Sequence, residues 1–201
     1  MTASAAVLLA ALIVAAASLA RARSGIGSVR GPGYAAARGS ESAGVRYAFT
    51  SAFLPWAKES AGGHLPTYLA GIVYHAGLFA MLARLVVTLL PVSVPRVLDL
   101  ALAPLLGVAL ACGLGLLAKR LTTPTLGALS QPDDVVANLL VDCALASAAA
   151  AALSPGVTPA FQLAGALLLV YAPLGKLRHM VFLVTSRRLW GQYYGRRGVR
   201  G

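Results

Sequence analysis

Residues 94–118 read VPRVLDLALAPLLGVALACGLGLLA, and this stretch decides the fold of the chain. It is apolar apart from Arg96 and Asp99 near its start, and its length is close to the roughly 20 residues with which a helix crosses about 30 Å of hydrocarbon. Stretches of similar character recur along the chain. The sequence therefore predicts five transmembrane helices, at residues 3–20, 65–90, 94–118, 134–153 and 158–183.

The composition agrees with a bilayer as the solvent of this protein. Of the 201 residues, 58% are hydrophobic and 11% are charged, and the mean hydropathy is +0.77. A water-soluble fold of this size would not readily stay monomeric with so much apolar surface. We therefore expect an all-α integral membrane protein with a single membrane domain over residues 1–201.

The formal charge of +11 resembles that of a nucleic-acid-binding protein until the basic residues are located. They lie between the predicted helices: Arg21, Arg23, Arg30, Arg38, Arg46 and Lys58 in the first loop, Lys119 and Arg120 in the third, and Arg187, Arg188, Arg196, Arg197 and Arg200 in the tail. The positive-inside rule then places the N-terminus outside, and the loop 21–63 and the tail 184–201 in the cytoplasm. We expect no nucleic-acid partner, a bacterial or archaeal cytoplasmic membrane, and secondary attraction to anionic lipid or an acidic partner.

The first apolar stretch has a second interpretation, as a cleaved signal peptide, because small residues at 17–22 resemble a cleavage region. No basic residue precedes the stretch, whereas Arg21 and Arg23 follow it directly. This charge bias favours an uncleaved helix whose second end lies inside.

The loop that follows is rich in Gly, Ser and Arg and shows no sustained apolar period over residues 24–63. Within it, Tyr47 to Trp56 (YAFTSAFLPW) regains apolar and aromatic character. Two interpretations remain open for this segment: an amphipathic stretch lying in the membrane interface, or an aromatic belt at the foot of the second helix.

Two of the three histidines lie inside predicted membrane helices, His75 in GIVYHAGLF and His179 in PLGKLRHMVF. An intramembrane imidazole is a candidate functional residue by default. Each has a glycine four residues earlier on the same helix face, Gly71 and Gly175, which would leave room for a flat macrocycle. Two facing imidazoles can bind one haem iron on both axial sides, and the alternative is that they hold two helices together by hydrogen bonds.

Other polar residues in or near the predicted helices have supporting interpretations. Lys176 and Arg178 flank the second histidine and are expected to contact haem propionates or quinone. His64 is expected at the interface near a propionate or a quinone, not as an iron ligand. Asp142 is a membrane carboxylate that could pair with Lys176, and Arg84 is expected to extend outward to water.

The motifs YHAGLF and YAPLGKLRHM, the latter followed by TSRRLWGQYYGRRG, resemble the gamma subunit of respiratory nitrate reductase and the related membrane cytochrome b subunits of heterodisulfide-reductase-like complexes. The segment FLPWAKES with the following His64 is most similar to the second group. The resemblance covers most of the chain. It implies His75 and His179 as ligands of the haem nearer a cytoplasmic partner, and it implies no outer haem, since residues such as Leu85 and Phe161 stand near the family's other two histidine positions.

The sequence thus predicts a membrane cytochrome b subunit of a respiratory redox complex. It would pass electrons between the quinone pool and a cytoplasmic iron-sulfur or oxidoreductase subunit through one bis-His haem b. The first alternative is a haem-free membrane anchor that binds quinone in such a complex, and the second is a small transporter.

Overall fold

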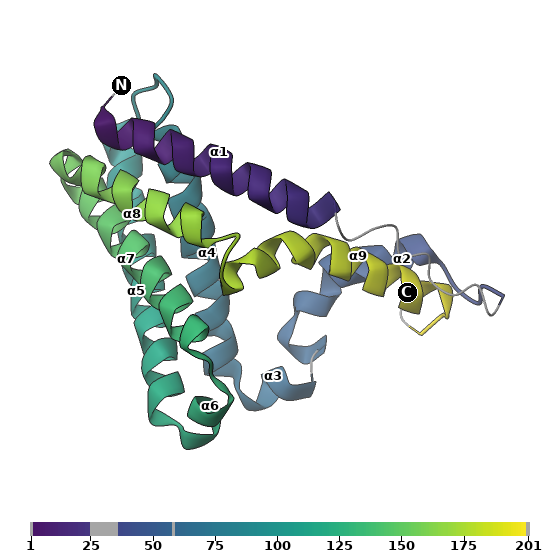
Figure 1. Cartoon of the computed structure of the whole chain (residues 1–201). Coiled ribbons are helices and arrows are strands. Elements are labelled where there is room, and N and C mark those ends of the chain that lie inside the picture. Colours follow the sequence, from purple (N-terminus) through teal and green to yellow (C-terminus); the bar gives the residue numbers. More distant parts are fainter. Residues whose placement is uncertain (1, 25–35, 58, 200–201) are drawn as a thin grey trace. The chain divides into compact units, whose positions relative to one another are not determined.

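The computed structural model describes residues 2–24, 36–57 and 59–199, and within these ranges it contains helices and no strand. The chain divides into two units (Figure 1), which we describe separately. The first unit comprises residues 1–17 and 66–177, and the second comprises residues 18–65 and 178–201. The all-α class predicted from the sequence is confirmed for the described residues.

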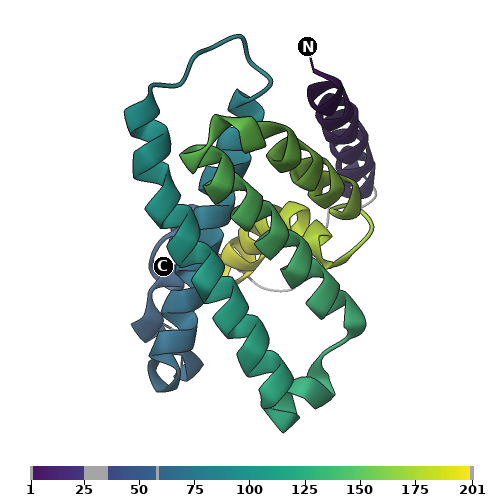
Figure 2. The ribbon, with the colours of Figure 1, turned by 90° about the vertical axis from the view of Figure 1, so that its left-hand side faces the viewer.

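Four helices are long and apolar enough to cross a membrane, which agrees with a multi-pass membrane protein. They are α1 (Ala3–Ser24), α4 (Leu65–Val87), α5 (Arg96–Thr122) and α7 (Pro132–Leu153). Figure 2 shows α5 and α7 side by side, joined through the short α6 (Pro124–Leu129). These four helices correspond to the first four apolar stretches of the sequence.

The fifth predicted helix is not continuous. It is replaced by α8 (Thr158–Tyr171), a turn, the 3-10 helix η4 (Lys176–Arg178) and α9 (His179–Arg196). Pro173 lies in the turn, where it lacks the N–H that a continued helix requires and its ring would crowd the preceding turn. With 14 residues, α8 is about 21 Å long and does not by itself match about 30 Å of hydrocarbon.

The core of the first unit is built from α1, α4, α5, α7 and α8. Its most deeply buried large side chains are Leu8, Met81, Leu106, Leu145 and Phe161. Small residues bring the helices close: a Cβ added to Gly77 of α4 would overlap the Ala109 side chain of α5. The N-terminal helix belongs to this core, since Ser4 donates a buried hydrogen bond of 2.6 Å to Gln162 Oε1 of α8.

The second unit is organised by the pairing of α2 (Glu41–Phe49) with α9. A Cβ on Gly44 would overlap the backbone of Gly191 and Gly195, so the two helices touch through glycine backbone. The 3-10 helices η1 (Ser51–Phe53) and η2 (Pro55–Ala57) and the helix α3 (Glu59–Gly63) follow. Residues 21–63, which the sequence predicts to be a loop, therefore contain helices in their described part. The glycine face of α2 is covered by α9, a helix distant in sequence.

Candidate functional site

His75 lies on α4, and its exposed imidazole makes one hydrogen bond that determines its chemistry. The Nδ1 atom lies 2.7 Å from the Gly71 carbonyl oxygen, and a carbonyl oxygen only accepts, so Nδ1 carries the proton. In the neutral ring the lone pair is then on Nε2, which is the arrangement that metal-bound histidines use. The rings of Tyr74 and Phe79 lie 6.2 and 6.5 Å away between centroids.

The two glycines that we expect to leave room for a macrocycle, Gly71 and Gly175, have different surroundings. A Cβ added at Gly71 would meet nothing within 4 Å, so the helix surface one turn before His75 is open. A Cβ added at Gly175 would overlap the ring of Tyr171, so the expected space beside Gly175 is filled. Only the first glycine provides room beside a candidate ligand.

The second candidate ligand has a different setting from the one expected. His179 is the first residue of α9, in the second unit, and does not lie inside a transmembrane helix; its side chain is exposed. Arg178 precedes it and is also exposed. His64 lies just before α4, is exposed, and its backbone N–H donates to the Ala61 carbonyl. His75 belongs to the first unit and His179 to the second.

Lys176 forms an ion pair that the sequence interpretation missed. Its Nζ pairs with Oδ1 of Asp134 in the first turn of α7, and Arg120 Nη1 lies 3.6 Å from Oδ2 of the same carboxylate. Beside them, the Tyr171 hydroxyl donates to Asp133. The pairing of Lys176 with Asp142 that we considered from the sequence is therefore wrong, and Lys176 is held at the start of α7.

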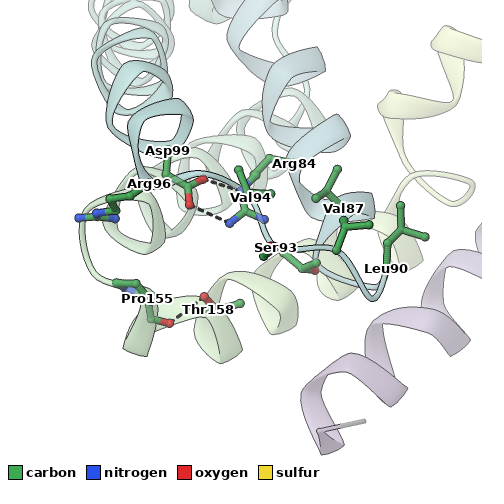
Figure 3. Close-up of a pocket in the computed structure, with 11 residues that line it drawn as sticks. Arg84, Val87, Leu90, Ser93, Val94, Arg96, Asp99, Pro155 and Thr158 are labelled. Atoms are coloured by element: carbon green, nitrogen blue, oxygen red, sulfur yellow. Dashed lines mark hydrogen bonds and ion pairs between the residues drawn. The ribbon is translucent and has the colours of Figure 1, made fainter.

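A second charged cluster lies where α4 ends and α5 begins. Arg84 donates two hydrogen bonds to Asp99, from Nε to Oδ1 at 2.7 Å and from Nη2 to Oδ2 at 3.1 Å. Figure 3 shows this pair on the wall of a pocket of about 350 Å³, with Arg96, Pro155 and Thr158 nearby. Arg96 donates at 2.5 Å to the Ala152 carbonyl at the end of α7, where a cation is favoured. Arg84 is thus paired and does not extend freely to water.

A hollow of about 460 Å³ lies between α4 and α5 near the start of one and the end of the other. Its lining is mostly apolar, and Lys119 lies at one end, where it donates at 2.6 Å to the Thr67 hydroxyl. Ala70, Cys112 and Gly115 line it further along the two helices. No pattern in the sequence predicts this hollow, because small residues create it only when the two helices pair.

The second unit gathers aromatic and basic side chains along the α2–α9 pair. Tyr47 and Trp190 stack with centroids 6.2 Å apart, and the Arg187 guanidinium lies 4.1 Å from the centre of the Phe53 ring. Arg187 also donates to the Ala48 carbonyl at 2.8 Å. The residues from Tyr47 onwards therefore pack on the C-terminal helix, and they do not form one amphipathic helix.

No family model, curated protein or solved structure matches this chain. What the fold itself defines is the class: an all-helical chain, within its described residues, with four helices able to cross a membrane. The family resemblance carried by YHAGLF and KLRHM stays a prediction. Among the described residues, no three His, Cys, Asp or Glu side chains gather into a metal-binding group.

Proposed function

We propose that this protein is a single-haem membrane cytochrome b subunit that passes electrons between quinone and a cytoplasmic iron-sulfur partner. The observation that carries the proposal is the hydrogen bond from His75 Nδ1 to the Gly71 carbonyl, which leaves Nε2 of an exposed ring as the unprotonated nitrogen. His179 is the proposed second ligand. Together the two imidazoles would hold the iron of one haem b.

The residues around His75 fit such a group. At Gly71 the helix surface beside His75 is open, since a Cβ added there has no neighbour within 4 Å. The Phe79 ring lies on the other side of His75 along the same helix, with its centroid 6.5 Å from that of the imidazole. Arg178, next to the proposed second ligand, is the better partner for an anionic propionate, because Lys176 already pairs with Asp134. His64 and Gly175 have secondary roles, near the cytoplasmic interface and in Tyr171 packing respectively.

A bound haem b would supply reversible one-electron chemistry, and the protein residues would orient it. In this proposal the Gly71 carbonyl would orient the His75 ring, and His75 and His179 would hold the haem iron for electron transfer. The cytoplasmic side would carry the exposed arginines of the second unit, including Arg46, Arg188 and Arg197, as an electrostatic docking surface for an acidic partner. The location is a bacterial or archaeal cytoplasmic membrane with the N-terminus outside.

A reduced-minus-oxidised optical spectrum of the purified protein, produced with excess haem precursor, tests the proposal. We expect a low-spin haem b spectrum at one haem per chain, lost in His75→Ala and in His179→Ala. His64→Ala is the matched control and should keep the full spectrum. A wild-type protein without low-spin haem, or a spectrum that survives both ligand substitutions, would refute the cytochrome.

The electron donor or acceptor is tested separately. A water-soluble quinol added anaerobically should reduce the haem, and a quinone should reoxidise it. Gentle solubilisation from the source membrane should also retain a subunit rich in cysteine motifs for iron-sulfur clusters. Haem that is unresponsive to both quinol and quinone would contradict the quinone-linked role.

A haem-free anchor is the second candidate, and one observation favours it. The Tyr171 ring fills the space beside Gly175, which a macrocycle at that position would need. In that case the same partner subunit would co-purify, quinone would bind, and no haem band would appear. The spectrum and the partner together distinguish the two functions.

A further inference from the structure

Asp142 is a carboxylate in the middle of a membrane helix. It lies ten residues after Pro132, so it is about 15 Å along α7 from the start of that helix. The residue is 4% exposed, and within the described part of the chain neither carboxylate oxygen accepts a hydrogen bond of good geometry, although the Tyr74 hydroxyl lies close enough to interact with it. A buried carboxylate without a donor is unfavourable when ionised, and more so in a membrane.

The surroundings of this carboxylate contain other oxygen atoms and one nearby hydroxyl donor, that of Tyr74. Asn138 lies one helical turn earlier on α7, and its Oδ1 is also buried without a hydrogen-bond partner among the described residues. From α4, the Tyr74 hydroxyl donates to the Asn138 backbone carbonyl at 3.3 Å. From α5, Gly113 faces the site so closely that an added Cβ would overlap both Asp142 Oδ1 and the Tyr74 ring.

The nearest charged groups belong to other clusters. Asp134, paired with Lys176 and Arg120, lies eight residues or about 12 Å earlier along α7, and Arg96 binds the carbonyl of Ala152, about 15 Å later. The other titratable side chains nearby are His75, beside Tyr74 and exposed, Cys112, beside Gly113 and partly buried, and Cys143, which follows Asp142 on α7 and is exposed. Among the described residues, none of these groups is a cation paired with Asp142.

The other three aspartates show the contrast. Asp99 accepts two hydrogen bonds from Arg84, Asp134 pairs with Lys176, and Asp133 accepts from Tyr171. Among the described residues, Asp142 is the aspartate whose carboxylate accepts no hydrogen bond of good geometry, and the donor near it is the neutral Tyr74 hydroxyl. No cation of the described residues is paired with it, so a proton is the positive charge that this site can take up.

We propose that Asp142, with Asn138 and Tyr74, forms an intramembrane proton-binding site of the helical bundle. The bound proton converts the carboxylate into a neutral acid with one O–H donor, and Asn138 Oδ1, one turn away, is an acceptor without another partner. The site lies wholly in the first unit and does not depend on haem, so it goes beyond the cytochrome proposed above.

The hollow between α4 and α5 is the route by which the proton exchanges with water. Ala70 lines the hollow four residues before Tyr74, and Cys112, which adjoins Gly113, lines it from α5. The hollow therefore reaches to about one helical turn from Tyr74 on α4 and to the residue next to Gly113 on α5, the two positions that adjoin the carboxylate. At its other end are the polar groups of Thr67 and Lys119, which can contact water.

Infrared spectroscopy of the purified, haem-free wild-type protein tests the bound proton directly. At neutral pH we expect a carbonyl band of a protonated carboxylic acid that shifts in deuterated water and is lost in Asp142→Asn. Asn138→Leu should retain this band at a higher frequency, because the acid loses its acceptor, which keeps the test informative should Asp142→Asn fold poorly. An absent band at neutral pH, or a band that appears only after sodium is removed, would overturn the proposal, the latter by showing a metal-cation site.

The exchange route has its own matched pair of variants. Gly115 lines the hollow and Gly107 does not, and an added Cβ meets nothing within 4 Å at either position of α5. Gly115→Val should slow the deuterium shift of the acid band by at least severalfold, whereas Gly107→Val should leave its rate unchanged. Equal rates in the two variants would refute the hollow as the route. Repeating both measurements in His75→Ala separates this site from the haem, since neither result should change.

Discussion

Removing one partner of the Arg84–Asp99 ion pair should destabilise the helical bundle more than removing both. The guanidinium and carboxylate form two near-parallel hydrogen bonds of 2.7 and 3.1 Å, and their side chains are 22% and 10% exposed. Asp99 also lies in the first turn of α5, where the helix dipole favours an anion. The pair is therefore largely shielded from water, and each charge depends on the other.

The expected magnitude follows from this burial. Breaking a fully buried pair by removing one partner costs roughly 3–5 kcal/mol, and an exposed pair contributes about 0–1 kcal/mol. Because Arg84 keeps some contact with solvent, we expect Asp99→Leu and Arg84→Met each to lower the free energy of unfolding by about 2 kcal/mol. The double variant should lose about 1 kcal/mol or less, since no unpaired charge remains.

Denaturation of the four proteins in mixed micelles, followed by circular dichroism, measures these differences. The coupling between the two substitutions should be about 3 kcal/mol or more, which additive effects cannot produce. Arg188→Met, at an exposed position, is the control for loss of a positive charge and should change the free energy by less than about 0.5 kcal/mol. Additive losses in the double variant would refute the reasoning, because they would mean that both charges are well solvated without each other.

Three further predictions concern other contacts. Gly191→Ile should separate α2 from α9, because even a Cβ there overlaps Val45 backbone, and faster proteolysis of residues 36–57 in the intact protein would show it; unchanged proteolysis would contradict the close pairing. Ser4→Ala should cost about 1–2 kcal/mol by leaving buried Gln162 without its donor, as measured by thermal unfolding, and no loss would place α1 outside the core. Asp134→Asn should lower the free energy of unfolding by about 1–2 kcal/mol, because Lys176 and Arg120 lose the anion that they share. The two cations are partly exposed, so high salt should reduce the difference in unfolding free energy between the wild-type protein and this variant, as measured by thermal unfolding; equal stability of the two proteins at low salt would contradict the ion pairs.

The sequence predicted the parts of the fold that depend on local composition. Four apolar stretches became helices with nearly the expected bounds, because length and hydropathy are enough to identify a membrane helix. The break at residues 172–178 was harder to predict from the sequence, because a proline inside an apolar stretch can either bend a helix or end it. That choice determines whether His179 lies within a helix or begins one.

For the candidate site, the sequence indicated individual polar residues but not their partners. His75 and Gly71 are singled out by the sequence because an intramembrane imidazole is rare and costly; the structure joins them by a hydrogen bond, and their role at a haem stays a prediction. Lys176 was assigned to a cofactor because its partner Asp134 lies 42 residues away in sequence, at the start of another helix. Asp142 was recognised as unusual, but Tyr74 and Asn138 could not be linked to it without knowing which faces of α4 and α7 meet.

The sequence by itself determined the helical class and the four stretches that are long and apolar enough to cross a membrane, because those follow from apolar length and from backbone hydrogen bonds that each helix satisfies internally. Tertiary structure alone decided the partners: Arg84 with Asp99, Lys176 with Asp134, α2 with α9, and the isolation of Asp142. The physical reason is that lipid drives helices into the bilayer without selecting which faces pack, and that selection depends on small residues and polar side chains far apart in the chain.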